Sequence, residues 1–285
     1  MPSPQNRWNS TTVLTVATVI VVACMFIPFG YLIVYPFRLF NTFVHEVGHA
    51  VAAVITGGYV ESMVVNLDTS GYVIRRGGWT PLVASAGYMG SILAGAALLV
   101  AGRKREWTRP ALMVLGVSTL LATAIFSGSG QSLMAFAGFG LGIALLALGR
   151  VQAKRKKANA HTDALGAGLI IATLGYAWFT DGLLTWAIGL LIGGGVLVIA
   201  FYASSLIQHL TVLFLGVQLS IDGLDSIQVL FRLTTSGHGH NDAVNMSEAV
   251  GLPPAFWAFT WGLMGVMVLV GAFWMFWRQE HPRKQ

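Results

Sequence analysis

The sequence predicts an all-α polytopic membrane protein with about nine transmembrane helices and one short β-hairpin. The chain is 55% hydrophobic and only 10% charged, and its mean hydropathy is +0.70. It also contains several apolar runs of about 20 residues, the length that crosses a bilayer. A soluble fold needs more charge to cover its surface, so we expect a single multi-pass membrane domain over residues 1–285.

The net charge of +6 is not spread evenly, because the basic residues lie in blocks at the ends of apolar runs. This placement favours cytoplasmic anchoring by the positive-inside rule and argues against nucleic-acid binding. The only cysteine, Cys24, lies in an apolar run, so we expect neither a disulfide nor a cysteine metal site. The basic blocks are Arg103 to Arg105 with Arg109, Arg150 with residues 154–157, and Arg278 with Arg283 and Lys284.

Residues 11–102 are expected to hold the first three spans. The first covers residues 11–34, and it lacks a small-residue cleavage site close behind it, so we expect it to stay in the membrane. Residues 35–38 read Tyr-Pro-Phe-Arg, which predicts an interfacial turn that breaks the helix. The second span then covers residues 39–55, and the third covers residues 81–101.

Between the second and third spans the pattern changes to that of a β-hairpin. Residues 59–76 carry Val, Met, Tyr and Ile on both sides of Asp68-Thr69-Ser70-Gly71. Turn residues flanked by β-prone residues are typical of a hairpin. An ordinary loop between two spans is the alternative.

The rest of the chain predicts two helical pairs and two final spans. The pairs lie in residues 110–202, and the last two spans lie in residues 206–277, separated by a polar loop at 234–254. The tryptophans of the last span are expected at the membrane interfaces. The expected spans are 110–126 with 133–148, 164–179 with 183–202, then 206–233 and 255–277, and the tryptophans are Trp257, Trp261, Trp274 and Trp277.

The second span carries the motif H-E-x-x-H as His45, Glu46 and His49. On a helix, residues four apart project from one face, so both imidazoles can hold a single metal ion. Glu46 follows the first ligand, and from there its carboxylate can take a proton from a water that the metal activates, the general-base role of a zinc hydrolase. Ionisable groups are costly in hydrocarbon, which argues against two chance histidines.

A catalytic zinc ion needs a third protein ligand and an open position. Asp222 is our first candidate, because it is a carboxylate inside an apolar run and Gly223 allows close backbone approach. Asp225 is then a candidate to accept a hydrogen bond from one of the histidines and so fix its tautomer. Asp242, beside His238 and His240, competes for the ligand position.

Three further histidines are weaker candidates. His238 and His240 could form an accessory metal site with Asp242, but a solvated loop with two flexible histidines is the commoner explanation. His209 lies in the same apolar run as Asp222. A lone helix histidine more often forms a hydrogen bond to a neighbouring span than binds a metal.

These motifs resemble the site-2 protease class of intramembrane zinc metalloproteases, the M50 peptidases, and more closely their M50B-like branch. The resemblance rests on the H-E-x-x-H motif, the hairpin and Ile221-Asp222-Gly223, which is similar to the Leu-Asp-Gly motif whose Asp is the third zinc ligand. Resemblance to the branch itself lies in residues 85–90, 241–243 and 252–257, so Asp242 stays open as the ligand. The Asn and Pro residues that usually precede Leu-Asp-Gly are absent here.

The resemblance implies a Zn²⁺-dependent peptidase of the cell membrane, with the plasma membrane of a bacterium as its location. His45, His49 and Asp222 would bind zinc, Glu46 would act as the general base, and the substrates would be membrane proteins or peptides. The hairpin would offer a strand edge to an extended substrate. The alternative is a metal-binding membrane transporter, or an inactive scaffold, whose buried polar residues line an ion path.

Overall fold

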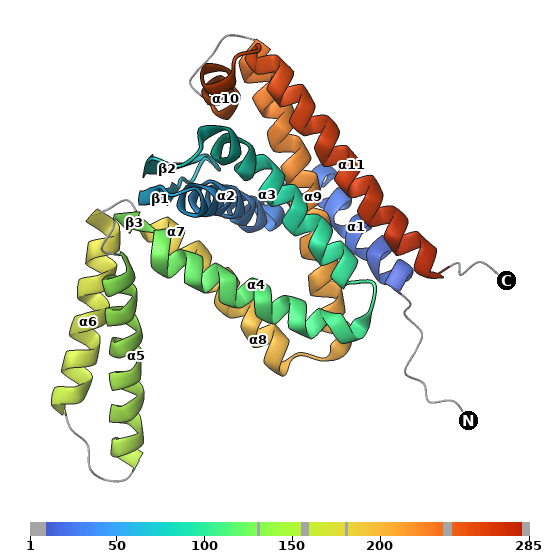
Figure 1. Cartoon of the computed structure of the whole chain (residues 1–285). Helices are drawn as coiled ribbons and strands as arrows, with labels where there is room; N and C mark the ends of the chain where they lie inside the picture. Colours follow the sequence, from blue (N-terminus) through green and yellow to red (C-terminus); the bar gives the residue numbers. More distant parts are fainter. Residues whose placement is uncertain (1–9, 130–131, 155–159, 180–181, 236–240, 281–285) are drawn as a thin grey trace, which may run out of the picture.

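The computed structural model describes residues 10–129, 132–154, 160–179, 182–235 and 241–280. The described chain is helical apart from a small sheet beside α2 (Figure 1). The helices are α1 (Ser10–Phe26), α2 (Gly30–Ile55), α3 (Thr80–Ala101), α4 (Arg105–Phe126), α5 (Ser132–Lys154), α6 (Ala160–Phe179), α7 (Leu183–Ile188), the π-helical segment η1 (Gly189–Gly193), α8 (Gly194–Tyr202), α9 (Ser205–Thr235), α10 (Asp242–Val250) and α11 (Pro254–Glu280).

Five helical segments of the described chain are long and apolar enough to cross a membrane. They are α3, α4, the continuous segment α7–η1–α8, α9 and α11. Shorter apolar stretches lie in α1, α5 and α6. The first expected span, 11–34, runs across the break between α1 and α2, and the other eight fall on helices. Only five helical segments of the described chain have the length and composition of a span, so nine membrane crossings stay a prediction.

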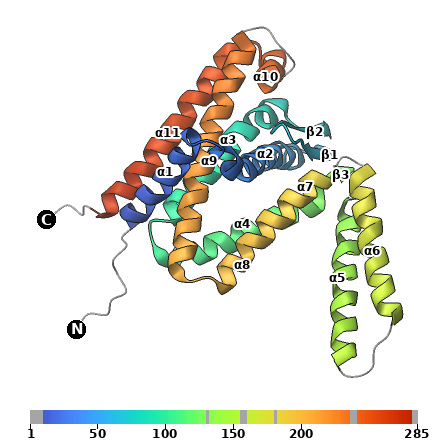
Figure 2. The same cartoon turned by 180° about the vertical axis from the view of Figure 1, so that it is seen from behind.

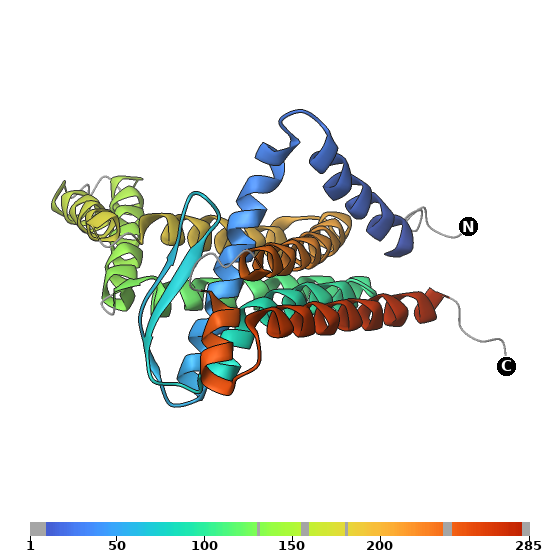
Figure 3. The same ribbon diagram turned by 90° about the horizontal axis from the view of Figure 1, so that it is seen from above.

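Helix α2 crosses the candidate spans (Figure 3), and α4 with the segment α7–η1–α8 is inclined to α9 and α11 (Figure 1). Helix α3 packs between α9, α11 and α2, so the centre of the molecule is formed by α2, α3 and α9. Because α2 lies across its neighbours, its middle turns face the first turns of α3. This crossing places the H-E-x-x-H motif near one end of the bundle of spans.

The break between α1 and α2 lies earlier than the sequence predicts. The chain turns at residues 27–29, where Phe29 has φ of 62°, and α2 then continues through Pro36. The residue before a proline avoids the helical region, so Pro28 explains why α1 ends at Phe26. The expected break at residues 35–38 is wrong.

Helix α2 continues through residues 35–38 without a break, and side chains of this segment contact other parts of the chain. The Tyr35 hydroxyl donates to the carbonyl of Leu67, and the ring of Phe37 packs edge-on against Phe214 at 4.8 Å between centroids. A proline inside a helix removes one backbone hydrogen bond and crowds the preceding turn. We infer that these contacts stabilise the helix enough to accommodate Pro36. They join residues far apart in the chain, so the local sequence does not reveal them.

The predicted hairpin is present as β1 (Tyr59–Val65) and β2 (Gly71–Arg76), paired antiparallel from Val65 opposite Gly71. Its turn is closed by Asp68, whose carboxylate accepts hydrogen bonds from the backbone and hydroxyl of Ser70. These bonds lower the pKa of Asp68. A third short strand, β3 (Gly128–Ser129), pairs with the other side of β1, giving the order β2-β1-β3.

The helices pair differently from the sequence prediction, which joined neighbours across the short turns. Helix α5 lies along α6, and α4 lies along α8 and η1, as the views from the front and from behind show (Figures 1 and 2). Gly142 and Gly166 explain the first pairing, because a Cβ at either would lie within 2.9 Å of the other's carbonyl oxygen. The absence of these side chains lets the two backbones approach closely.

The expected polar loop at residues 234–254 contains a helix, α10, within its described part. Asn241 caps this helix, because its side-chain oxygen accepts hydrogen bonds from the backbone N–H groups of Ala243 and Val244. Asparagine is among the strongest N-cap residues. Ala243 and Met246 are buried against α3 and α11. His238 and His240 lie outside the described residues.

Two apolar clusters enclose the region that holds the motif. The larger joins α2, the sheet, α4, α8 and α9, and includes Phe40, Phe43 and Met63. The second joins α3, α9, α10 and α11, and includes Ile92 and Trp261. Trp261 is only 2% exposed, so its side chain packs inside the protein.

Candidate metal centre

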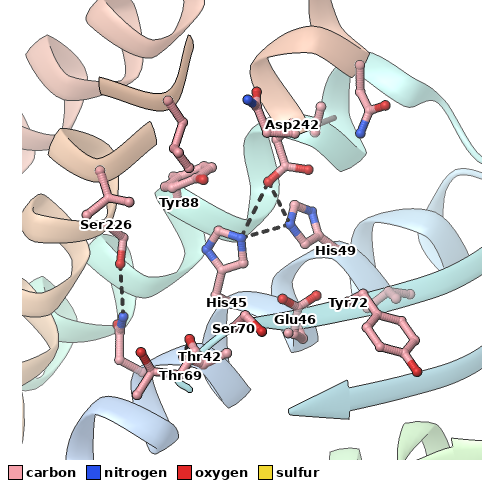
Figure 4. A pocket seen from close by; sticks show the side chains of 18 of the residues that line it. Thr42, His45, Glu46, His49, Thr69, Ser70, Tyr72, Tyr88, Ser226 and Asp242 are labelled. Carbon is pink, nitrogen blue, oxygen red and sulfur yellow. Dashed lines mark hydrogen bonds and ion pairs between the residues drawn. The ribbon is translucent and has the colours of Figure 1, made fainter. Parts of the chain in front are cut away.

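The middle turns of α2 present His45 and His49 to the first turns of α3 (Figure 4). Their Nε2 atoms lie 3.0 Å apart and point toward a common centre. This is the arrangement that the four-residue spacing predicts on a helix. His49 is buried and His45 is partly buried.

The orientation of His49 is set by the backbone of α3. Its Nδ1 atom lies 2.6 Å from the carbonyl oxygen of Val83. A ring N–H that donates to a carbonyl leaves the other nitrogen with a free lone pair, so Nε2 can bind a metal. The sequence reading gave this tautomer-fixing role to Asp225, and the structure gives it to a main-chain carbonyl, which no side-chain motif reveals.

Two glycines let α2 and α3 approach closely enough to form the site. A Cβ on Gly48 would lie 2.3 Å from the carbonyl oxygen of Ala86. A Cβ on Gly87 would lie 2.4 and 2.5 Å from the Nε2 atoms of His49 and His45. The space beside the two nitrogens therefore exists only because residue 87 has no side chain. In the sequence, this segment was noted only for its resemblance to the M50B-like branch.

Asp242, in the first turn of α10, completes the group. Its Oδ2 atom lies 3.2 Å from Nε2 of His49 and 3.5 Å from Nε2 of His45. Ligand atoms around a tetrahedral zinc ion with bonds of 2.0–2.1 Å are separated by roughly 3.4 Å. The three donor atoms thus have the spacing of three corners of such a site, and they could hold a metal ion.

The charge balance at this group favours an ionised carboxylate on Asp242. Burial opposes ionisation, but the charge of His49 and hydrogen bonds with both rings outweigh it, so the pKa of Asp242 lies below its usual value. An ionised carboxylate is the form that binds a metal. The capped start of α10 holds this side chain in place.

Glu46 lies beside the group without joining it (Figure 4). Its side chain is almost fully buried, with an exposed fraction of 4%. The start of β2 covers it, because a Cβ on Gly71 would lie 2.7 Å from Oε1 of Glu46. The hairpin thus limits the positions that the Glu46 carboxylate can take. The carboxylate lies next to the space between the two histidines.

Tyr88 forms another side of the site. Its ring packs edge-on against His45 at 4.5 Å between centroids and stacks on Trp261 at 5.6 Å. The contacts from Trp261 of α11 through Tyr88 to His45 restrict the orientation of the His45 ring. Sequence reasoning did not assign Tyr88 to the site, because one aromatic residue in an apolar span carries no distinct signal.

The structure does not bring Asp222 to the histidine pair. Asp222 is buried on α9, where its carboxylate accepts a hydrogen bond from Nε2 of Gln218 at 2.8 Å and its carbonyl accepts one from the hydroxyl of Ser226. It also does not line the cavity at the metal centre. The preference for Asp222 assumed that Asp242 lay in a solvated loop, whereas Asp242 begins the helix α10, which packs against α3 and leaves it partly buried.

Two other sequence candidates also have partners away from the metal centre. Asp225 forms an ion pair with Arg38 at 2.9 Å, on the rim of the cavity. His209 is fully buried at the far end of α3, where its Nε2 atom lies 2.7 Å from the carbonyl oxygen of Gly102. This is the hydrogen bond to a neighbouring span that a lone helix histidine was expected to make.

A cavity of about 660 Å³ opens beside the metal centre. Its walls come from α2, the hairpin turn with β2, the start of α3, the end of α9 and the start of α10. Tyr72 and Val73 of β2 contribute to it, and the edge of β2 away from β1 has no strand partner in the described chain. The site therefore has room for an extended peptide.

Comparison with known families agrees with this site. The model of the Peptidase M50B-like family matches the chain twice, over residues 12–152 and 123–272. These matches cover most of the sequence, and the chain belongs to the Peptidase M50B-like family. Neither a curated protein nor a solved structure matches it. Family membership and the five apolar helices together identify a membrane protein of a peptidase family.

Proposed function

We propose that the protein is a membrane-embedded zinc metallopeptidase that hydrolyses peptide bonds of membrane-associated substrates. The observation that carries the proposal is the group of His45, His49 and Asp242, whose donor atoms have tetrahedral spacing beside a buried glutamate and a cavity. Two imidazoles and a carboxylate are a donor set that zinc accepts. The ligand assignment departs from the sequence reading in one position, with Asp242 in place of Asp222.

The metal would supply Lewis acidity, lowering the pKa of a water molecule and polarising the scissile carbonyl. Glu46 is the group positioned to act as general base. Its carboxylate accepts a proton from the attacking water and then delivers a proton to the nitrogen of the leaving amine, so the two proton transfers balance. The buried position of Glu46 keeps bulk water from competing for that proton.

Substrate binding is expected along β2. The peptide bonds of a membrane-spanning helix are engaged in its own hydrogen bonds, so a substrate must be locally extended before cleavage. The open edge of β2 can pair with an extended chain by strand addition. Because Gly71, at the start of β2, contacts Glu46, a peptide on this edge would run past the general base.

The test compares the wild type with Glu46→Gln in proteoliposomes that contain a library of synthetic transmembrane peptides. New N-termini are identified by mass spectrometry, and bound zinc is measured in the same preparations. We expect cleavage by the wild type and a loss of roughly 10²–10⁴-fold or more in Glu46→Gln, with zinc unchanged. The matched control, Glu248→Gln, removes an exposed carboxylate on α10 and should cleave normally.

Equal cleavage by the wild type and Glu46→Gln would show that the assigned base is wrong. No cleavage by the wild type, together with zinc flux across the same vesicles, would favour the transporter. A transporter needs the metal ligands but does not need a base, so Glu46→Gln would keep that flux.

A further inference from the structure

Tyr88, on the third turn of α3, is a polar side chain of the cavity wall that the proposed proton transfers do not use. Its ring is held on two sides, edge-on against His45 with an interplanar angle of 86° and stacked on Trp261 with an angle of 18°. Trp261 is itself fixed in the apolar cluster of α3, α9, α10 and α11. The ring of Tyr88 therefore has little freedom to rotate, and its hydroxyl keeps one position relative to the two histidines.

The hydroxyl of Tyr88 forms no hydrogen bond with any other residue that the structure describes. Tyrosine hydroxyls in protein interiors usually have a partner, and Tyr88 is partly buried. Its phenolic oxygen interacts electrostatically with the carboxylates of both Asp242 and Glu46. A hydrogen-bond donor without a partner thus lies close to a proposed metal ligand and to the proposed general base.

Other donors of the cavity wall are less well placed to act on a substrate at the metal centre. Arg38 and Arg75 are both engaged, the first in an ion pair and the second in hydrogen bonds with the chain that follows it. The amide of Asn245, on α10, also lines the cavity. Tyr88 differs from Asn245 in its direct ring contact with His45, which ties its position to the metal centre.

Peptide hydrolysis creates a negative charge that a fixed donor can stabilise. When the oxygen of water bonds to the scissile carbonyl carbon, the π electron pair moves onto the carbonyl oxygen and a proton passes from the water to Glu46. When the C–N bond breaks, the carbonyl re-forms and the amine nitrogen takes the proton from Glu46. A donor that is aimed at the charged oxygen lowers the barrier and keeps its own proton throughout.

We propose that Tyr88 is a further catalytic residue, whose hydroxyl donates a hydrogen bond to the carbonyl oxygen of the scissile peptide bond as that oxygen becomes negatively charged. The inference rests on the proposed peptidase function. Tyr88 then has two separable parts, a ring that orients His45 and a hydroxyl that acts on the substrate. Because the charge develops only as the bond is attacked, the hydroxyl affects kcat rather than KM.

The test compares the wild type with Tyr88→Phe, a change that removes the hydroxyl and retains the ring. Cleavage of a synthetic transmembrane peptide and zinc content are measured in the same proteoliposomes. We expect kcat to fall roughly 10²–10³-fold, the usual effect of losing one such donor, with KM and zinc content unchanged. The matched control, Tyr202→Phe, removes the hydroxyl of a side chain that is 85% exposed at the end of α8, and it should cleave normally.

A second readout measures binding without turnover. A phosphinic peptide carries negatively charged oxygens where the attacked carbonyl would be, whereas a reduced-amide peptide has no oxygen at that position. A hydrogen bond to a charged group changes affinity by roughly 10- to 100-fold. We therefore expect Tyr88→Phe to bind the phosphinic peptide more weakly than the wild type by this factor, and to bind the reduced-amide peptide equally well.

An unchanged kcat together with an unchanged affinity for the phosphinic peptide would overturn the role of Tyr88, while cleavage by the wild type would still support the proposed function. Loss of zinc in Tyr88→Phe would also overturn it, because the hydroxyl would then support the metal ligands. A fall in kcat in Asn245→Ala but not in Tyr88→Phe would assign the donor to α10 instead. Absence of cleavage by the wild type would remove the proposed function and this inference with it.

Discussion

The Oδ2 atom of Asp242 lies 3.2 Å from Nε2 of His49, although the two residues are 193 positions apart in the sequence. Asp242 begins α10, a short helix between two candidate spans, whereas His49 lies in the middle of α2. The metal centre is thus assembled from a helix that crosses the bundle and a helix outside the candidate spans.

The choice of third ligand is tested by alanine substitution. Asp242→Ala should lose stoichiometric zinc, because one of three donor atoms is removed. Loss of a second-shell partner already costs 10–100-fold in affinity, so a decrease of at least about 100-fold is expected. The matched control is Asp222→Ala, whose carboxylate bonds to Gln218 and should not affect zinc. The zinc content of the two purified variants distinguishes the two candidates. Loss of zinc in Asp222→Ala but not in Asp242→Ala would favour Asp222 as the ligand.

Gly87 tests whether the space beside the two imidazoles is needed. Gly87→Ala places a Cβ within 2.5 Å of both Nε2 atoms, so the rings must move apart and zinc should be lost. Gly90→Ala, one turn further along α3, is the control, since its Cβ would meet nothing closer than 3.6 Å. Zinc titration of both variants measures the effect. Equal affinities in the two variants would contradict the assigned geometry.

Gly71 tests the contact between the hairpin and the general base. In Gly71→Ala the new Cβ would lie 2.7 Å from Oε1 of Glu46, so the carboxylate must shift. We expect cleavage to fall roughly 10-fold or more, since misplacement of a catalytic group by about 1 Å can cost up to 10²-fold, while bound zinc stays unchanged. Gly140→Ala, which has open space around it on α5, serves as the control. Zinc loss in Gly71→Ala would show that the hairpin supports the ligands as well.

Tyr88 tests whether an aromatic ring supports His45. Tyr88→Ala removes the edge-on contact and should weaken zinc binding, because His45 gains rotational freedom. Tyr88→Phe retains the ring and should restore the affinity. Aromatic pairs contribute about 0.5–1.5 kcal/mol beyond area burial, which corresponds to a change of roughly 2- to 12-fold. If the phenylalanine variant also loses zinc, the hydroxyl rather than the ring is required.

Local patterns in the sequence predicted much of the fold. The four-residue spacing of His45 and His49 placed both rings on one helix face, and the turn residues from Asp68 to Gly71 identified the hairpin. Asn241 also carried a local signal, since an asparagine before a helical segment is a typical cap. The helix α10 was therefore predictable, and it was missed because the neighbouring glycines and histidines indicated a loop.

By itself, the sequence determined the membrane character, the motif helix, the hairpin and two of the three proposed ligands, because these depend on composition and on contacts between residues close in the chain. Only the tertiary structure placed Asp242, and not Asp222, beside the histidine pair, fixed His49 on the carbonyl of Val83 and brought Gly87 to the two imidazoles. The physical reason is that these contacts join α2 to α3 and α10. The distances between residues of α2, α3 and α10 depend on the angles at which these helices cross and on how closely their backbones approach. The sequence pattern of one segment predicts neither.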